Sequence, residues 1–128
     1  MLSTHLEDWL TEAGADIVVK RQADIASLSP SEQLIYEIWL LDTEARNGGL
    51  SQYFGNRGSA QWQGCVAAAK FANLSSFRLF AAEVGAVIEG SAEPYNAFIQ
   101  QGAEVENLWY KYQSPVVTEL YAFCNHAL

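Results

Sequence analysis

The stretch SPSEQLIYEIWLLDTEARNGG, residues 29–49, decides the fold of this 128-residue chain. Ser29, Pro30 and Glu32 have the types and spacing of a helix start, with a capping serine, a first-turn proline and a capping-box glutamate. The following LIYEIWLL is apolar except for one glutamate, and a helix that is apolar nearly all round is buried nearly all round. The stretch predicts a buried central helix over about residues 30–46.

The sequence NGG, residues 47–49, ends this helix. Asparagine and glycine readily adopt the left-handed conformation that terminates helices, so we expect a positive φ at Gly48 or Gly49. We call residues 47–58, NGGLSQYFGNRG, the corner. It contains no lysine and follows a helix, so it does not fit a phosphate-binding loop.

Most residues of the corner have a structural interpretation. Tyr53 and Phe54 are expected to anchor a short segment, and a buried Gln52 would need hydrogen bonds, which free carbonyl groups at the helix end could supply. The alternative is that the corner also presents a polar contact patch, formed by Gln52, Asn56 and Arg57.

Helical signals on both sides of this stretch predict about five further helices. The first runs from a capping box at Thr4 and Glu7 into the twenties, and later starts are expected at Ser59, at Ser75 or Ser76, at Pro94, and at Ser114-Pro115. No stretch alternates convincingly as a strand would. We therefore predict an all-α, compact bundle of about six helices around the central one, forming a single domain over residues 1–128.

The composition indicates a globular cytoplasmic protein. No apolar run approaches the roughly 20 residues needed to cross a bilayer, and the N-terminus has acids where a signal peptide needs bases. Cys65 and Cys124 fall at positions predicted to lie in the core, and we expect them to be buried free thiols in a reducing compartment.

The net charge of −8 argues against direct binding to nucleic acid, and its distribution is uneven. Residues 1–44 hold nine acids and two bases, and residues 83–128 hold six acids and one base. Residues 45–82, which we call the cationic segment, hold four bases and no acid. We expect this segment to pair with acidic elements, such as Asp42 and Glu44, within the chain or across a homodimer.

The central helix and the corner also carry a resemblance. An apolar helix with acids near its end, running into NGG, then Gln52, two aromatic residues, and an Asn and Gly, resembles the DNA mimic protein family over about residues 30–126. The resemblance implies an all-α fold without known catalytic activity. It also raises the hypothesis that the protein imitates DNA to occupy a DNA-binding protein.

Charge density limits how much DNA the chain could imitate. Duplex DNA carries one charge per roughly 1.7 Å of axis, so a 30 Å face would present about 18, more than the fifteen acids of the whole chain. A local imitation is less demanding. Asp8, Glu12 and Asp16 would form one stripe along the first helix, about 6 Å apart, with Trp9 at its edge. The alternative is an ordinary solvated helix face.

The sequence gives no support for catalysis, a metal or a cofactor. His5 and His126 lie at opposite ends of the chain, outside any metal-ligand spacing. Glu37, the charge within LIYEIWLL, is expected to reach the surface or meet an arginine, the alternative being a buried carboxyl with a raised pKa. Two hypotheses result. The first is a non-catalytic module that binds a basic protein surface, such as that of a DNA-binding protein. The second is an enzyme or ligand-binding domain with its site at the corner. A deep polar pocket at the corner would favour the second.

Overall fold

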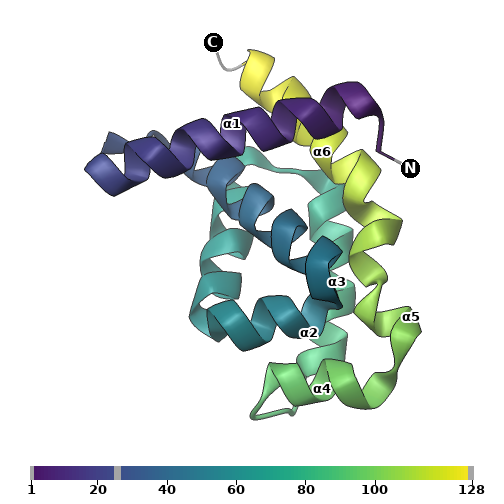
Figure 1. The fold of residues 1–128 in the computed structure, drawn as a ribbon. Helices are drawn as coiled ribbons and strands as arrows, with labels where there is room; N and C mark the ends of the chain where they lie inside the picture. Colours follow the sequence, from purple (N-terminus) through teal and green to yellow (C-terminus); the bar gives the residue numbers. More distant parts are fainter. Residues whose placement is uncertain (1, 25–26, 127–128) are drawn as a thin grey trace.

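The computed structural model describes residues 2–24 and 27–126, and all regular elements within them are helices (Figure 1). In chain order these are α1 (Thr4–Ala23), α2 (Pro30–Ala72), α3 (Ser75–Ile88), α4 (Pro94–Gln101), α5 (Ala103–Glu106) and α6 (Leu108–His126). The predicted compact all-α fold is confirmed. Residues 1, 25–26 and 127–128, which the expected domain also includes, lie outside the described part of the chain.

Helix α2 consists of three segments joined at glycines. Its backbone leaves helical geometry at Gly48, Gly49 and Gly58, which separates residues 30–47, 50–57 and 59–72. Gly49 has a φ of +81°, and the predicted left-handed glycine is therefore confirmed. The corner contains a helical segment of its own between two such glycines, because Gly58 also has a φ of +81°.

The first segment of α2 is the buried central helix. It begins with the predicted capping box, in which the Glu32 N–H donates to Ser29 Oγ at 3.2 Å and the Ser29 N–H donates to the Glu32 carboxylate at 2.9 Å. Leu34, Ile38 and Leu41, which follow at helical spacing, have no exposed surface. Burial of this apolar face, more than helix propensity, stabilises the segment.

Helix α1 lies across the first segment of α2 and also packs against α6 (Figure 1). Its N-cap is Ser3, whose Oγ accepts a hydrogen bond from the Leu6 N–H at 3.3 Å. The capping box predicted at Thr4 and Glu7 is therefore wrong, because a cap at Ser3 puts Leu6 where a capping-box glutamate would be needed. The Glu7 carboxylate is left to bind a side chain of another helix. Leu10 is buried in the core beneath α1.

The C-terminal half departs from the prediction at two places. The long helix expected from Pro94 is interrupted at Gly102, which has a φ of +92°, a conformation that glycine adopts without side-chain strain. Pro115 does not open a new helix but lies inside α6. It removes one hydrogen bond to the preceding turn. Val116 and Val117 beside it are fully buried, and their packing holds the helix together.

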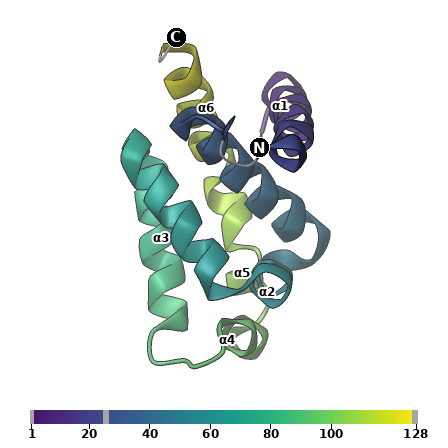
Figure 2. The same ribbon diagram turned by 90° about the vertical axis from the view of Figure 1, so that its left-hand side faces the viewer.

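An apolar core joins side chains from every helix. Trp62, Phe77 and Phe80 are buried in it, and the Trp109 ring packs edge-on against Phe80 with centroids 5.1 Å apart. Figure 2 shows the third segment of α2 and α3 side by side on one side of the molecule, with α1 on the other.

Candidate partner-binding surface

Asp8, Glu12 and Asp16 are all exposed on α1. Their spacing of four residues places them along one face, about 6 Å apart. Within the described residues, none of these three carboxylates takes part in a hydrogen bond or an ion pair. Their charges are therefore available to a molecule that approaches this face.

Contacts at both ends and in the middle hold α1 on α2. The Glu7 carboxylate binds Arg46 Nη2 at 2.5 Å, and this hydrogen bond is the largest cause of the raised pKa of Arg46. Towards the other end, Lys20 Nζ lies 2.9 Å from the carboxylate of Glu32. Each partly exposed ion pair contributes little to the stability of the fold. Between these two ends, α1 packs on α2 at Gly14.

Gly14 lies directly against the ring of Trp39. A Cβ atom built at this glycine would come within 2.2 Å of Trp39 Cδ1 and Cγ, so no other residue fits without movement of the ring or the helix. Ile17, one turn further along α1, is buried with Tyr36 and Leu40 of α2. The face of α1 opposite the acidic stripe is thus fixed by close packing.

Trp9 has mainly a packing role. It is half-buried, and its ring meets that of Tyr121 from α6 edge-on, with centroids 5.1 Å apart. The His5 ring also meets the Tyr121 ring edge-on, with centroids 5.7 Å apart. Only part of the Trp9 side chain is left at the edge of the acidic stripe.

The polar side chains of the corner bind a carboxylate of the central helix. Gln52 Nε2 donates to Glu44 Oε1 at 3.3 Å, and Arg57 Nε donates to Glu44 Oε2 at 3.3 Å. Gln52 is more than half buried, as predicted, but the expected hydrogen bonds to backbone carbonyls are wrong. The physical reason is that Glu44, 8% exposed, is a charged acceptor and binds these donors more strongly than a carbonyl group would.

The rest of the corner is anchored in the core. Tyr53 and Phe54 are buried, and the Phe54 ring stacks on Phe98 of α4 with centroids 5.2 Å apart. Asn47 and Asn56 are exposed. The predicted aromatic anchor is confirmed.

Asp42 forms a buried network that sequence reasoning did not identify. It is 5% exposed; its Oδ1 accepts hydrogen bonds from Trp109 Nε1 at 2.9 Å and from Gln113 Nε2 at 2.7 Å. Its Oδ2 lies 3.5 Å from Arg46 Nη1. Arg46 therefore pairs with carboxylates of both α1 and α2, and the expectation that Asp42 and Glu44 pair with the cationic segment is confirmed. The only sequence signal was an acid placed directly after an apolar run.

Glu37 is buried, at 3% exposure, and the expectation that it reaches the surface is wrong. Its carboxylate accepts hydrogen bonds from Gln61, and from Gln33 Nε2 at 3.5 Å. Burial raises its pKa, and the hydrogen bonds from Gln61 and Gln33, with the charge of Arg21, offset only part of this rise. The burial therefore favours the alternative of a carboxyl with a raised pKa, and the expected arginine, Arg21, acts on Glu37 through its charge without forming an ion pair within the described residues.

Several other features bear on chemistry. A hollow of about 640 Å³ lies between the second half of the corner and the start of α4. Of the three residues of the alternative polar patch, Asn56 lines it, whereas Gln52 and Arg57 do not. Among the residues described, no group of three or more His, Cys, Asp or Glu is arranged to hold a metal ion.

Cys65 and Cys124 are free thiols, and burial raises the pKa of both, that of Cys124 to about 11. Cys65 is fully buried as expected, whereas Cys124 is only half-buried.

None of the helices within residues 2–24 and 27–126 combines the length and the apolar character that crossing a membrane requires.

Comparison with protein families matches residues 26–123 to the family described as DMP19-like protein. The chain belongs to the DMP19-like protein family. The resemblance expected from the central helix and the corner is thereby confirmed. No curated protein and no solved structure matched the chain.

The DMP19-like region begins after α1 and ends within α6. It contains the central helix, the corner, and the buried carboxylates of Glu37, Asp42 and Glu44. The acidic stripe of α1 lies outside it. Family membership therefore says nothing about the stripe, which is characterised by its own exposure, its spacing and the attachment of α1 to α2.

Proposed function

We propose that this DMP19-like protein is a non-catalytic binding module that engages the basic surface of a DNA-binding protein through the acidic stripe of α1. The observation that carries the proposal is the free, exposed state of Asp8, Glu12 and Asp16 on a helix whose opposite face is closely packed. Like charges at this spacing repel one another by a few tenths of a kcal/mol. A basic partner would relieve that repulsion.

The stripe would imitate a short length of one DNA strand rather than a duplex face. Its three carboxylates follow one another at about 6 Å, which suits lysine and arginine side chains arranged for phosphates. Membership of the DMP19-like family supports the DNA mimic role. The fifteen acids of the chain are too few for a larger imitation.

Electrostatic steering would be the main contribution of the stripe. A row of like charges raises the rate of association with an oppositely charged surface more than it raises final affinity, and salt weakens the effect. The net charge of −8 adds a longer-range field of the same sign. The module would thus find its partner quickly at low ionic strength.

The test begins with the tagged protein used to capture its partner from the native cytoplasm, identified by mass spectrometry. Association rates are then measured for the wild type and for the triple variant Asp8→Asn, Glu12→Gln, Asp16→Asn at two salt concentrations. We expect the variant to keep its fold and to associate about tenfold more slowly, with a weaker salt dependence.

A matched control separates the stripe from net charge. Glu89, Glu93 and Glu104 are exposed on or beside α3, α4 and α5, and changing all three to glutamine removes the same charge elsewhere. This control variant should associate at nearly the wild-type rate. Equal slowing by both variants, or wild-type behaviour of the stripe variant, would refute the role proposed for α1.

The second hypothesis, a ligand or catalytic site at the corner, receives less support. Gln52 and Arg57 are both engaged with Glu44, which leaves Asn56 as the one member of the polar patch that lines the hollow at the corner. The proposed role places the protein in the cytoplasm, with the DNA-binding proteins it would engage. The homodimer considered from the charge distribution stays a prediction, which sedimentation at two salt concentrations tests.

A further inference from the structure

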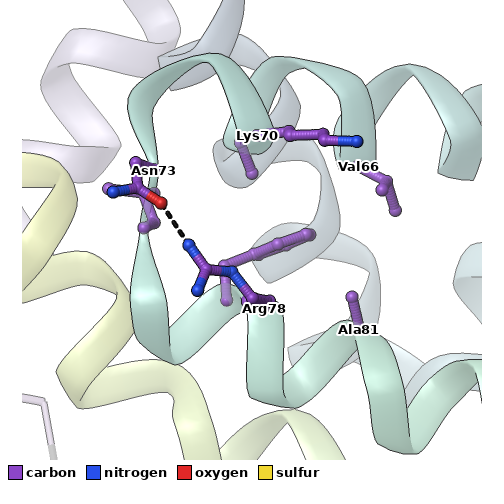
Figure 3. A pocket seen from close by; sticks show the side chains of 8 residues that line it. Val66, Lys70, Asn73, Arg78 and Ala81 are labelled. Atoms are coloured by element: carbon purple, nitrogen blue, oxygen red, sulfur yellow. Dashed lines mark hydrogen bonds between the residues drawn. The ribbon is translucent and has the colours of Figure 1, made fainter.

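A cavity of about 310 Å³ lies between the third segment of α2 and the start of α3 (Figure 3). Its walls are mainly apolar, and two cations and an amide stand at its rim. The lining residues are Val66, Ala69, Lys70, Asn73, Leu74, Phe77, Arg78 and Ala81. The volume is at the lower end of the range for small-molecule sites, about 300–1,000 Å³.

The tight turn between the two helices lines this cavity with Asn73 and Leu74. Asn73 ends α2 in the left-handed conformation, with φ +54°. The Asn73 N–H donates to the Lys70 carbonyl at 3.1 Å and the Leu74 N–H to the Ala69 carbonyl at 3.4 Å, which is the Schellman pattern of a helix end. The Asn73 side chain accepts a hydrogen bond from the Arg78 guanidinium (Figure 3). The cavity is therefore built by local backbone geometry.

The charge at the rim is uncompensated. Of the four bases in the cationic segment, Arg46 and Arg57 pair with carboxylates. Lys70 and Arg78, the other two, have no carboxylate partner within the described residues. Both are exposed, and both line the cavity, from opposite helices. In a protein with net charge −8, the two bases of the cationic segment that form no ion pair within the described residues thus lie at one apolar cavity.

We propose that this cavity binds a small organic anion, a monocarboxylate with an aromatic or short aliphatic body. The body would occupy the apolar walls at Val66, Leu74 and Phe77, and the carboxylate would lie between Lys70 and Arg78. Each contact matches the ligand chemistry, because apolar surface gains from burial and a carboxylate gains from a charged donor.

This site is independent of the acidic stripe. Figure 2 shows α1 and α3 on opposite sides of the molecule, and no residue of α1 lines the cavity. A ligand here would therefore add a small-molecule binding activity to the proposed protein-binding role, and either could hold without the other.

The test is a titration of the ¹⁵N-labelled protein followed by NMR, using 3-phenylpropionate and octanoate, each beside its neutral amide, with acetate as the anion without an apolar body. At least one of the two carboxylates should give saturable shift changes centred on residues 66–81. It should bind at least threefold more tightly than its amide, and acetate should give no saturable change. Absence of saturation by both carboxylates, a preference below threefold, or shifts centred elsewhere would overturn the proposal.

Variants locate the interaction. Lys70→Gln changes an exposed side chain and should keep the fold while weakening carboxylate binding about threefold to tenfold, and Arg78→Gln should act in the same direction. Ala81→Leu should fill the cavity and abolish binding of the acid and the amide together. Lys111→Gln removes an exposed cation of α6 that pairs with Glu83, away from the cavity, and should leave binding unchanged. Equal weakening by Lys70→Gln and Lys111→Gln would overturn the site and indicate a general charge effect.

Discussion

Glu106 accepts hydrogen bonds from both the backbone N–H and the hydroxyl of Ser51, at 2.7 and 2.5 Å, across 55 positions of sequence. Ser51 belongs to the first turn of the segment 50–57, where backbone N–H groups have no partner within the helix. The carboxylate of α5 therefore acts as an N-cap supplied by another element. A similar contact joins Glu119 of α6 to the N–H and hydroxyl of Ser76 at the start of α3.

Removing the charge of Glu106 should destabilise the corner. Glu106→Gln keeps the size of the side chain but weakens two charge-assisted hydrogen bonds, and we expect the free energy of unfolding to fall by about 1–2 kcal/mol. Glu104→Gln, an exposed neighbour on the same short helix, should change it by no more than about 0.5 kcal/mol. Urea denaturation measures both, and equal effects would contradict the capping role.

The two left-handed glycines that bound the corner should differ in their tolerance of a side chain. Alanine at Gly58 meets only backbone strain, about 1–2 kcal/mol, since nothing lies within 4 Å of its added carbon. At Gly49 the added carbon would also come within 3.2 Å of the Glu106 carboxylate. Thermal or urea unfolding should therefore rank Gly49→Ala as the less stable variant, and valine at Gly49 as less stable still. The reverse order would show that the Glu106 contact carries no cost.

The packing of α1 against α2 should depend on Gly14. Gly14→Ala would place a methyl carbon 2.2 Å from atoms of the Trp39 ring and is expected to cost about 1–3 kcal/mol, despite the better helix propensity of alanine. Gly85→Ala is the matched control, because Gly85 lies in α3 with open space around the added carbon, and it should stabilise the protein slightly. If both substitutions stabilise, the close contact with Trp39 is not a constraint.

Glu37 should make the stability of the protein depend on pH in an unusual direction. Its pKa is raised in the folded state by burial, so the folded protein binds more protons than the unfolded chain from about pH 4.3 up to the folded pKa. Stability contributed by the protonated carboxyl is therefore lost as the pH rises through this window. Glu37→Gln should become progressively more stable relative to the wild type between pH 4 and pH 7, measured by urea denaturation.

Glu32 provides the control of opposite sign. Its pKa is lowered, mainly by the hydrogen bond from the Ser29 backbone and then by Lys20, so its contribution is present above the unfolded pKa and is lost as the pH falls through the folded pKa. Glu32→Gln should approach the stability of the wild type towards low pH. If the stability of both variants relative to the wild type changed with pH in the same direction, the environments assigned to Glu37 and Glu32 would be contradicted.

The helices that sequence analysis located best are those whose starts and faces are local in the chain. Ser29 and Glu32 are three residues apart, and the apolar run after them needs no partner to be recognised. Gly49 could be placed because a helix with a buried end needs a residue that adopts positive φ. The aromatic anchors Tyr53 and Phe54 followed from their position between two turn signals.

The contacts that were missed are tertiary. Nothing near Glu106 or Glu119 in the sequence indicates that these carboxylates cap distant helix segments. Pro115 carries a local signal for a helix start, but its buried neighbours overrule that signal. The position of Asp42 beneath Trp109 depends on how α6 packs on α2. The exposure of the acidic stripe was predictable from the spacing of its residues. The close packing of α1 against Trp39 at Gly14 could be seen only in the structure.

Hydrogen exchange at the Trp109 indole should report on the stability of the whole molecule. Its N–H is fully buried and donates to a carboxylate, while Trp9 and Trp39 are half-buried at the edges of the fold. Solvent deuterium can replace that proton only when α6 separates from α2, and such exchange in a core reports opening free energies that approach the global value. One indole resonance, followed over hours in heavy water, would therefore measure unfolding of the native protein without denaturant.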